Sequence, residues 1–384
     1  MTSRATPIRA AAPAAVAQQS PGRPASAPHR VFTGGMLSTS VALVLAVLAG
    51  AAPEPMVLKL GTLAPAGSAW HDALRDLARR WEEASGGRVR VKVYPGGTQG
   101  SEGDMLRKLG IGQLQAAAVT NVGLHDLVTE PQAFSVPLLF RDDDEAACTF
   151  RRVRPRLDEA ARARGLEVVQ WTRIGQASFF CTRPVRTPAE AAAVKTFAWD
   201  GDPGTVKAWR AAGFQPVVLP STELVPALTT RMIDCVGQLP LYMLTTRAFE
   251  RAHHLVDLPW GFVLGATVVR RETWERVPAD LRPTLLAIAA EAGERIDADA
   301  RRLEGEAIVA MARSGLSIIP VDRGAWSAAL ERAWPVLRGE VVPAPFFDAV
   351  VAARDACRAA ALAPTPERHA TRAAPEGSLS ATRR

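Results

Sequence analysis

The sequence predicts an α/β fold with one helix long enough to lie across two domains, and one observation supports each part of that prediction. After Glu54, stretches that alternate apolar and polar residues, as strands do, are separated by stretches with the three-to-four-residue apolar spacing of helices. One stretch breaks this rhythm, because residues 278–315 read as a single helix of about 30 residues. Such a helix is longer than one small domain needs and is long enough to lie across two.

The first elements follow one another closely. Residues 56–62 form a strand, and a helix follows with Ser68 as its N-cap and Gly86 or Gly87 as its stop. Residues 88–95 alternate strictly and form a second strand. The next helix begins near Ser101 and leads into a strand over residues 115–120.

Seven further strands, a capped helix and a polar tail are predicted after residue 120. The aspartates of residues 141–147 are an N-capping run that begins a helix. The chain after Leu362 is polar, and we expect residues 362–384 to be a disordered tail. Further strands are predicted over residues 166–172, 177–183, 194–200, 214–220, 232–237, 264–271 and 316–321.

The N-terminus has the pattern of an export signal. Residues 36–52 form an apolar run, too short for a typical transmembrane helix, that ends in small residues. We interpret residues 1–53 as the signal region, with cleavage near Ala51–Ala52, and expect a periplasmic protein. The alternative is an uncleaved membrane anchor.

All four cysteines of the chain follow the expected signal region. Export implies an oxidising environment, in which Cys148, Cys181, Cys235 and Cys357 can pair in three ways. These cysteines are widely spaced and form no Cys-x-x-Cys motif. The spacing favours buried free thiols over disulfides.

Net charge does not indicate a nucleic-acid partner. The chain carries a formal charge of +7. Four arginines and no acid precede Pro53, and the segment from Leu362 holds four arginines against two glutamates. Most of the surplus therefore lies at the two ends of the chain, and the body is close to neutral.

No segment has the pattern of a catalytic or cofactor site. The glycine-rich residues 93–120 lack both the Gly-Lys-Ser/Thr ending of a phosphate loop and the Gly-x-Gly-x-x-Gly spacing, so these glycines serve turns and helix ends. His253 and His254 lack the i, i+4 spacing of paired metal ligands. We therefore expect no enzyme activity, no cofactor and no metal.

Aromatic residues gather near the ends of the predicted strands. Ligands of open α/β sheets bind beyond the carboxyl ends of strands, so such residues are candidates for a binding site. The alternative is that most of them are core residues. Trp199 is the least core-like, because the chain leaves its strand there for a turn of glycine, proline and aspartate. The candidates are Trp171, Phe179, Phe180, Phe197, Trp199 and Trp260.

These segments together resemble the extracytoplasmic solute-binding proteins of TRAP (tripartite ATP-independent periplasmic) transporters. Residues 93–120 are similar to a strand–turn–helix–strand block of that family, with Gly100, Glu102, Leu106, Gly112 and Leu114 in register. Residues 137–146, 182–201 and 219–241 resemble three later blocks, in the same order and spacing. The resemblance covers about Val57 to Ala360.

The resemblance implies a two-lobe periplasmic binding protein fold of class α/β, with an interlobe cleft and a long helix that spans both lobes. Residues 54–172 and 262–300 would form lobe I, and residues 173–261 and 301–361 would form lobe II. A solute would bind between the lobes, which close on it by hinge motion.

The departures from the family pattern concern the ligand. Most members carry an arginine that clamps a substrate carboxylate where this chain has Phe197, and a second arginine where it has Gln176. A polar asparagine of the family falls at Gln238 or Leu239, and an often polar position is Leu63. Arg173 lies nearby as a possible substitute. We therefore expect an aromatic, amphipathic or hydrophobic ligand rather than a simple dicarboxylate.

The resemblance also implies a set of site residues and partners. The partners are a small organic solute, the membrane permease subunits of a TRAP transporter and a tetratricopeptide protein. The alternative function is an exported sensor or enzyme domain that reuses the two-lobe fold. The ligand-binding candidates are Thr62, Leu63, Trp70, Glu102, Thr120, Asn121, Arg173, Gln176, Phe179, Phe197, Trp199, Asp200, Gln238 and Tyr242.

Overall fold

The computed structural model describes residues 54–200 and 202–362, whose strands form one mixed sheet. The expected signal region and most of the expected tail lie outside the described residues. The sheet order is β2-β1-β3-β8-β4-β7-β5-β6, and β9 pairs with β8. The strands are β1 (Met56–Thr62), β2 (Val89–Tyr94), β3 (Ala116–Thr120), β4 (Leu166–Cys181), β5 (Lys195–Trp199), β6 (Gln215–Leu219), β7 (Cys235–Gln238), β8 (His254–Arg270) and β9 (Ser317–Ile319).

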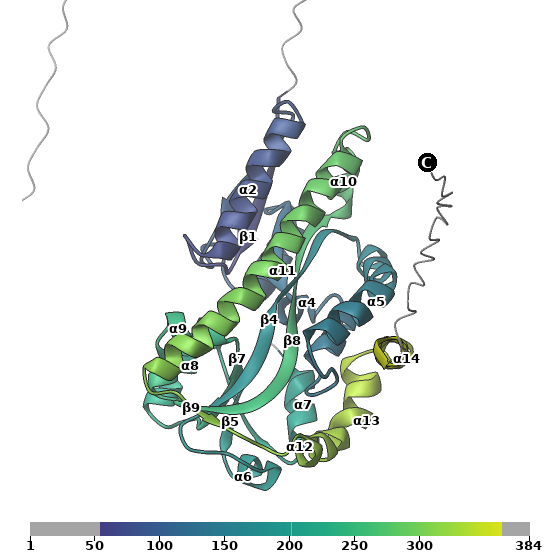
Figure 1. The fold of residues 1–384 in the computed structure, drawn as a ribbon. Helices are drawn as coiled ribbons and strands as arrows, with labels where there is room; N and C mark the ends of the chain where they lie inside the picture. Colours follow the sequence, from purple (N-terminus) through teal and green to yellow (C-terminus); the bar gives the residue numbers. More distant parts are fainter. Residues whose placement is uncertain (1–53, 201, 363–384) are drawn as a thin grey trace, which may run out of the picture. The chain divides into compact units, whose positions relative to one another are not determined.

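Helices follow most of the strands, as the α/β prediction requires (Figure 1). The α-helices are α2 (Ala69–Ala84), α3 (Glu102–Gly110), α4 (Asn121–Leu124), α5 (Asp143–Ala163), α6 (Pro188–Ala192), α7 (Pro203–Ala211), α8 (Leu224–Thr229), α9 (Pro240–Thr245), α10 (Arg271–Arg276), α11 (Arg282–Arg313), α12 (Arg323–Leu330), α13 (Trp334–Val336) and α14 (Ala344–Leu362). Shorter helical turns are η1 (Glu130–Ser135), η2 (Ser221–Glu223), η3 (Ala248–Glu250), η4 (Glu331–Ala333) and η5 (Leu337–Val341).

Helix starts confirm the local predictions. The Ser68 side chain accepts a hydrogen bond from the backbone N–H of His71 at the start of α2. Ser101 forms a capping box with Asp104 at the start of α3, in which each side chain bonds the backbone of the other residue. The Asp142 side chain accepts the backbone N–H of Glu145 at the start of α5, so the acidic run is a helix start.

Two long strands, β4 and β8, hold the sheet together. Residues 166–172 and 177–183 were predicted as separate strands, and this is wrong, because one strand runs from Leu166 to Cys181. Its pairing with β8 slips between Arg173 and Gly175 and again after Ala177. The bulged middle lowers the regularity of the sequence pattern, which explains why it reads as a break between two strands.

The two long strands join two groups of shorter strands. Strand β3 pairs with β8 only from Gly265 to Val269, and the parallel strands β1 and β2 extend the sheet beyond it. Strand β7 pairs with β4 only from Ser178 to Cys181, and β5 and β6 extend the sheet on that side. Each group therefore uses a different half of the long strands.

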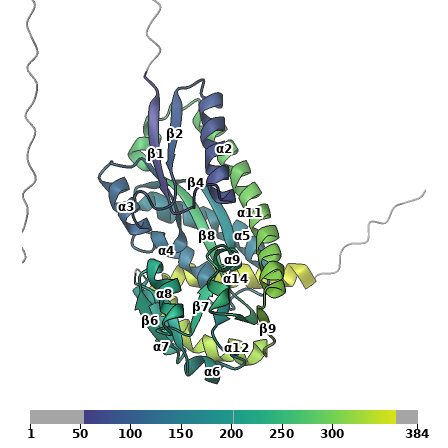
Figure 2. The same ribbon diagram turned by 90° about the vertical axis from the view of Figure 1, so that its left-hand side faces the viewer.

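The long helix predicted between residues 278 and 315 is confirmed as the 32-residue helix α11. In Figure 1 it runs from the neighbourhood of α2 to that of α8 and α9, and Figure 2 shows the same course from the side. Its first half packs into an apolar cluster with β1, β2 and α2 through Leu285 and Ile288. Its last turns pack into a second cluster with α8 and α9 through Met311. The helix thus contacts both strand groups.

The cysteine prediction is wrong, because all four cysteines form disulfides. Cys148 of α5 bonds Cys357 of α14, across 209 residues of sequence. Cys181 and Cys235 are directly paired neighbours on β4 and β7. Sequence spacing cannot show such pairings, since both depend on which elements become neighbours in the fold.

Candidate functional site

The registers of the sheet place the carboxyl ends of the two strand groups at different levels of β4. Thr120 at the end of β3 is opposite Gly265, which is opposite Thr172 of β4. Gln238 at the end of β7 is opposite Ser178. The five residues from 173 to 177 therefore bridge the two levels, over about 20 Å of extended strand between Thr172 and Ser178. Ligands of α/β sheets bind beyond such strand ends, so this interval is the candidate site.

Several of the predicted residues lie at the first of these edges. Thr62 is buried and ends β1, and Leu63 after it is 43% exposed. Trp70 on α2 lines a small hollow against α11, together with Ala300 and other residues of that helix.

Glu102 and Thr120 form a contact that joins α3 to the end of β3. The Glu102 carboxylate accepts hydrogen bonds from the backbone N–H of Thr120 at 2.6 Å and from its hydroxyl at 2.7 Å. Burial raises the pKa of the Glu102 carboxyl, and the two bonds from Thr120 oppose that rise. This carboxylate therefore fixes the end of β3 to α3.

Asn121 is fully buried and its side chain is already used. Its amide nitrogen donates to Gln132 Oε1 at 2.9 Å and to Ser135 Oγ at 2.7 Å. Its oxygen accepts the backbone N–H of Leu264 at 3.2 Å. Asn121 therefore ties η1 to β8 in this structure.

The second edge brings aromatic residues together. Phe197 is 3% exposed and meets Trp199 edge-to-face, with ring centroids 5.4 Å apart. Trp199 and Tyr242 are partly buried against the same apolar cluster. The Gln238 side chain accepts the backbone N–H of Leu239 at 2.9 Å. Asp200, the next residue after β5, is exposed.

Phe179 lies in the core. It is fully buried and stacks on Trp260, with centroids 5.0 Å apart, and on Trp209 at 6.0 Å. Edge-to-face contact with Trp326 completes its surroundings. This cluster explains why aromatic residues near strand ends are not by themselves a binding signal.

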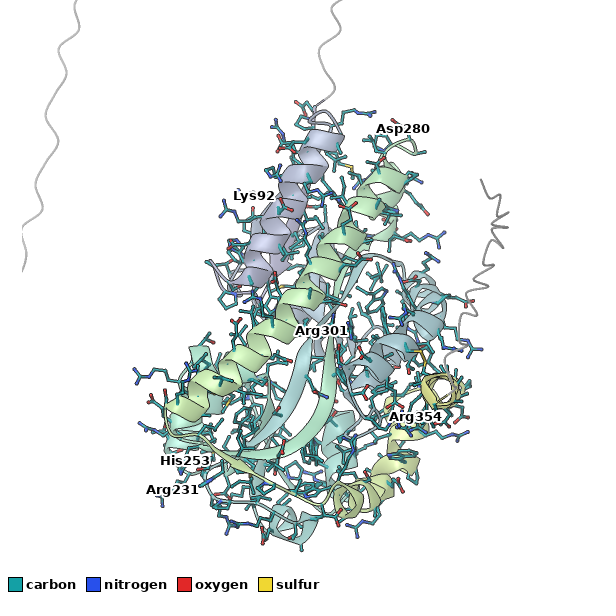
Figure 3. All side chains as sticks on the ribbon, viewed as in Figure 1. Lys92, Arg231, His253, Asp280, Arg301 and Arg354 are labelled. Carbon is teal, nitrogen blue, oxygen red and sulfur yellow. A yellow bond between two sulfur atoms is a disulfide. The ribbon has the colours of Figure 1, made fainter. Side chains whose placement is uncertain are left out.

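Arg173 is held by two carboxylates. Its Nη1 lies 2.7 Å from Asp143 Oδ1, and its Nε lies 3.2 Å from Asp297 Oδ2. The side chain is 11% exposed. Figure 3 labels Arg301 on the middle of α11, and this residue bonds the second oxygen of Asp143 at 3.0 Å. The positive charge of Arg173 is therefore already compensated within the protein.

Sequence reasoning missed Glu304. This residue of α11 accepts the backbone N–H of Gln176 at 2.7 Å. A Cβ atom at Gly175 would lie 1.9 Å from the same Glu304 oxygen, so the glycine makes room for the carboxylate. Burial raises the pKa of Glu304 to about 8. Its position seven residues after Asp297 on one helix was the available signal, since such residues share a face.

The two strand groups share the crossing strands β4 and β8, and their carboxyl ends point to the same interval of β4. Helix α11 packs against both groups. This arrangement defines a two-lobe α/β binding fold. The chain belongs to bacterial extracellular solute-binding protein family 7, also called DctP, whose model matches residues 60–338. It is 24% identical over 302 residues to the C4-dicarboxylate-binding periplasmic protein DctP of Rhodobacter capsulatus, covering 77% of this chain and 90% of that protein. It is 23% identical over 299 residues to the 2,3-diketo-L-gulonate-binding periplasmic protein YiaO of Escherichia coli, covering 76% and 91%.

Solved structures share the fold. A TRAP periplasmic solute-binding protein from Roseobacter denitrificans with bound β-D-glucuronate superposes with a TM-score of 0.70 at 18% identity, covering 77% of this chain and 99% of that one. Another from Desulfovibrio salexigens, with bound orotic acid, gives 0.68 at 17% identity, covering 79% and 96%. The chain is a TRAP-type periplasmic solute-binding protein, and its family is one of transport rather than of enzymes. Within the described residues, no helix is long and apolar enough to cross a membrane.

Proposed function

We propose that this protein captures an aromatic, amphipathic or hydrophobic small molecule between its lobes and delivers it to a TRAP-type membrane permease. The main observation that supports this ligand class is Trp199 at the end of β5, which is only partly buried and meets the core residue Phe197 edge-to-face, at 5.4 Å between ring centroids. Aromatic faces at a strand end offer stacking worth about 0.5–1.5 kcal/mol per pair beyond area burial.

The state of Arg173 supports the same proposal. A carboxylate that enters a closed site loses water and needs a cation to offset the loss. Arg173 is the arginine nearest to the family's clamp. Its charge is already neutralised by Asp143 and Asp297, so it is not free to pair with a carboxylate of the ligand. An anionic dicarboxylate would therefore lose several kcal/mol of hydration, which its few carbons do not return.

We propose that lobe I comprises residues 54–172 and 262–300, and lobe II residues 173–261 and 301–361, with closure by a hinge at the bulged middle of β4. The site would consist of the residues named from the sequence around the two strand edges, without Phe179, which lies in the core. Release would be to the permease subunits, and a tetratricopeptide partner stays a prediction. Export by a cleaved signal peptide belongs to the same proposal. The alternative, a sensor or enzyme domain on this fold, has no observation in its favour.

Two measurements test the ligand class. Native mass spectrometry of protein purified without added ligand should release a small molecule with an aromatic or apolar body. Calorimetry should show no binding of succinate or malate at millimolar concentration. Trp199→Ala should lower the affinity for the ligand found by mass spectrometry at least about tenfold, which is about 1.4 kcal/mol of binding free energy. Micromolar binding of succinate that Arg173→Ala abolishes would contradict the proposal.

A further inference from the structure

One carboxylate on the crossing stretch of α11 lacks a cationic partner. Asp297, Arg301 and Glu304 are spaced by four and three residues, so they share a face of the helix. Asp297 pairs with Arg173, and Arg301 pairs with Asp143. Across residues 54–200 and 202–362, no lysine, arginine or histidine lies within 4.0 Å of the Glu304 carboxylate, whose protein partner is the Gln176 N–H.

The position of Glu304 is at the candidate site. Its oxygen lies over Gly175, in the five-residue interval that separates the two strand edges. The side chain of Leu239 also comes within 3.1 Å of a Cβ atom built at Gly175, and Leu239 directly follows Gln238 at the end of β7. Glu304 therefore faces the place where β4, β7 and α9 meet.

The surroundings of Glu304 disfavour the ionised form of its carboxyl group in the ligand-free protein. Burial disfavours its ionised form, and the negative charge of Asp143 on α5 adds to that effect. Asp297 of α11 lies one helical turn beyond Arg301, and the two arginines that face this region, Arg173 and Arg301, are bonded to other carboxylates. Glu304 is partly buried and has no cationic partner among the described residues. An ionisable group in that state, beside a candidate site, is a common mark of a binding group.

We propose that Glu304 binds a cationic, hydrogen-bond-donating end of the solute, so that the natural ligand is an amine with an aromatic or apolar body. This rests on the proposed function and specifies its ligand. An ammonium group would supply the missing partner of Glu304 while the body of the molecule lies against the aromatic edge of β5. A carboxylate at the same place would find no free cation, because Arg173 and Arg301 are already paired with Asp297 and Asp143.

The test compares two probes of the same size and opposite charge. Isothermal titration at pH 8 would measure 2-phenylethylammonium and 3-phenylpropionate on the wild type, on Glu304→Gln and on a control, Glu306→Gln. Glu306 is an exposed acid of the same helix that pairs with Arg302. We expect the ammonium to bind the wild type at least about tenfold more tightly than the carboxylate. Glu304→Gln should remove that preference, and Glu306→Gln should keep it.

A second variant tests the same proposal if Glu304→Gln does not fold. In Gly175→Ala the new methyl group would occupy the position of the Glu304 carboxylate, which would have to leave the Gln176 N–H while its charge is retained. It should also reduce the preference for the ammonium. Equal binding of both probes to the wild type would contradict the proposal that the ligand is an amine, but it would agree with a site for an aromatic ligand. Binding of neither probe at millimolar concentration would overturn both. If both Glu304→Gln and Gly175→Ala still prefer the ammonium probe, a residue other than Glu304 binds it, and the proposal is wrong.

Discussion

Asp297 of α11 holds Arg173 of β4 at two atoms, accepting its backbone N–H at 2.6 Å and its Nε–H at 3.2 Å. The backbone contact lies at the slip in register between β4 and β8, next to Gly175. The ion pair therefore fixes the crossing strand to the long helix, and Arg173 has a structural role.

Removal of Arg173 should reduce stability. Arg173→Ala would leave Asp143 and Asp297 partly buried without their shared cation, at 28% and 22% side-chain exposure. We expect the free energy of unfolding in urea to fall by about 3 kcal/mol or more. The matched control is Arg301→Ala, whose side chain is 52% exposed, and which should cost about 0–1 kcal/mol. Equal losses in the two variants would contradict the structural role of Arg173.

Stability should depend on pH through Glu304. Its folded pKa of about 8 is above the ordinary value near 4.3, so the folded state holds a proton that the unfolded state releases. The stabilisation from that proton is complete below about pH 4 and is lost as pH rises through about 8.

Unfolding of the wild type and of Glu304→Gln should be compared between pH 4 and 9. The wild type should lose stability relative to the variant by at most about 1.4 kcal/mol per pH unit, and the difference should level off above about pH 8. A difference that stays constant over this range would show that Glu304 is ionised in the folded protein.

The two disulfides should contribute unequally. In the chain-entropy description, a link across 209 residues stabilises about 1 kcal/mol more than one across 54. The double variant Cys148→Ser/Cys357→Ser should therefore unfold at lower urea than Cys181→Ser/Cys235→Ser. Alkylation of the unfolded wild type without reductant should modify no cysteine. Four modified thiols would instead support the free thiols that the spacing favoured.

The N-terminus of the mature protein should lie near Ala52. The apolar run of residues 36–52 ends in small residues, as cleaved export signals do. N-terminal sequencing of protein from the periplasmic fraction would check this. An intact run recovered from membranes would indicate an anchor.

Local chemistry in the sequence predicted most elements of the fold. Ser68, Ser101 and the acidic run at Asp142 marked helix starts, because caps act within three residues of themselves. The long helix was predictable because its spacing runs without interruption. Strand β4 was divided in the prediction because the bulge near Gly175 interrupts its alternation.

The site was less predictable, because its chemistry depends on partners far away in sequence. Arg173 reads as a free cation until Asp297, 124 residues later, is placed beside it. Asn121 reads as a polar wall residue until Leu264 is found 143 residues away. The spacing of Glu304 from Asp297 is visible in the sequence, but the glycine beneath its carboxylate, which distinguishes it from the other acids of α11, is found only in the fold.

The nested order of the disulfides has a consequence for how the chain matures. A polypeptide that enters an oxidising compartment N-terminus first presents Cys148 and then Cys181 well before Cys357 follows. The first two thiols to meet are therefore not native partners, and a bond between them would leave Cys235 and Cys357 without their native partners. Correct pairing needs either a delay until the C-terminal helix has crossed or an exchange catalyst that undoes the early bond. Secretion yield in a host without a disulfide isomerase would then be limited by the C-terminal end of the body, which is the last part to arrive.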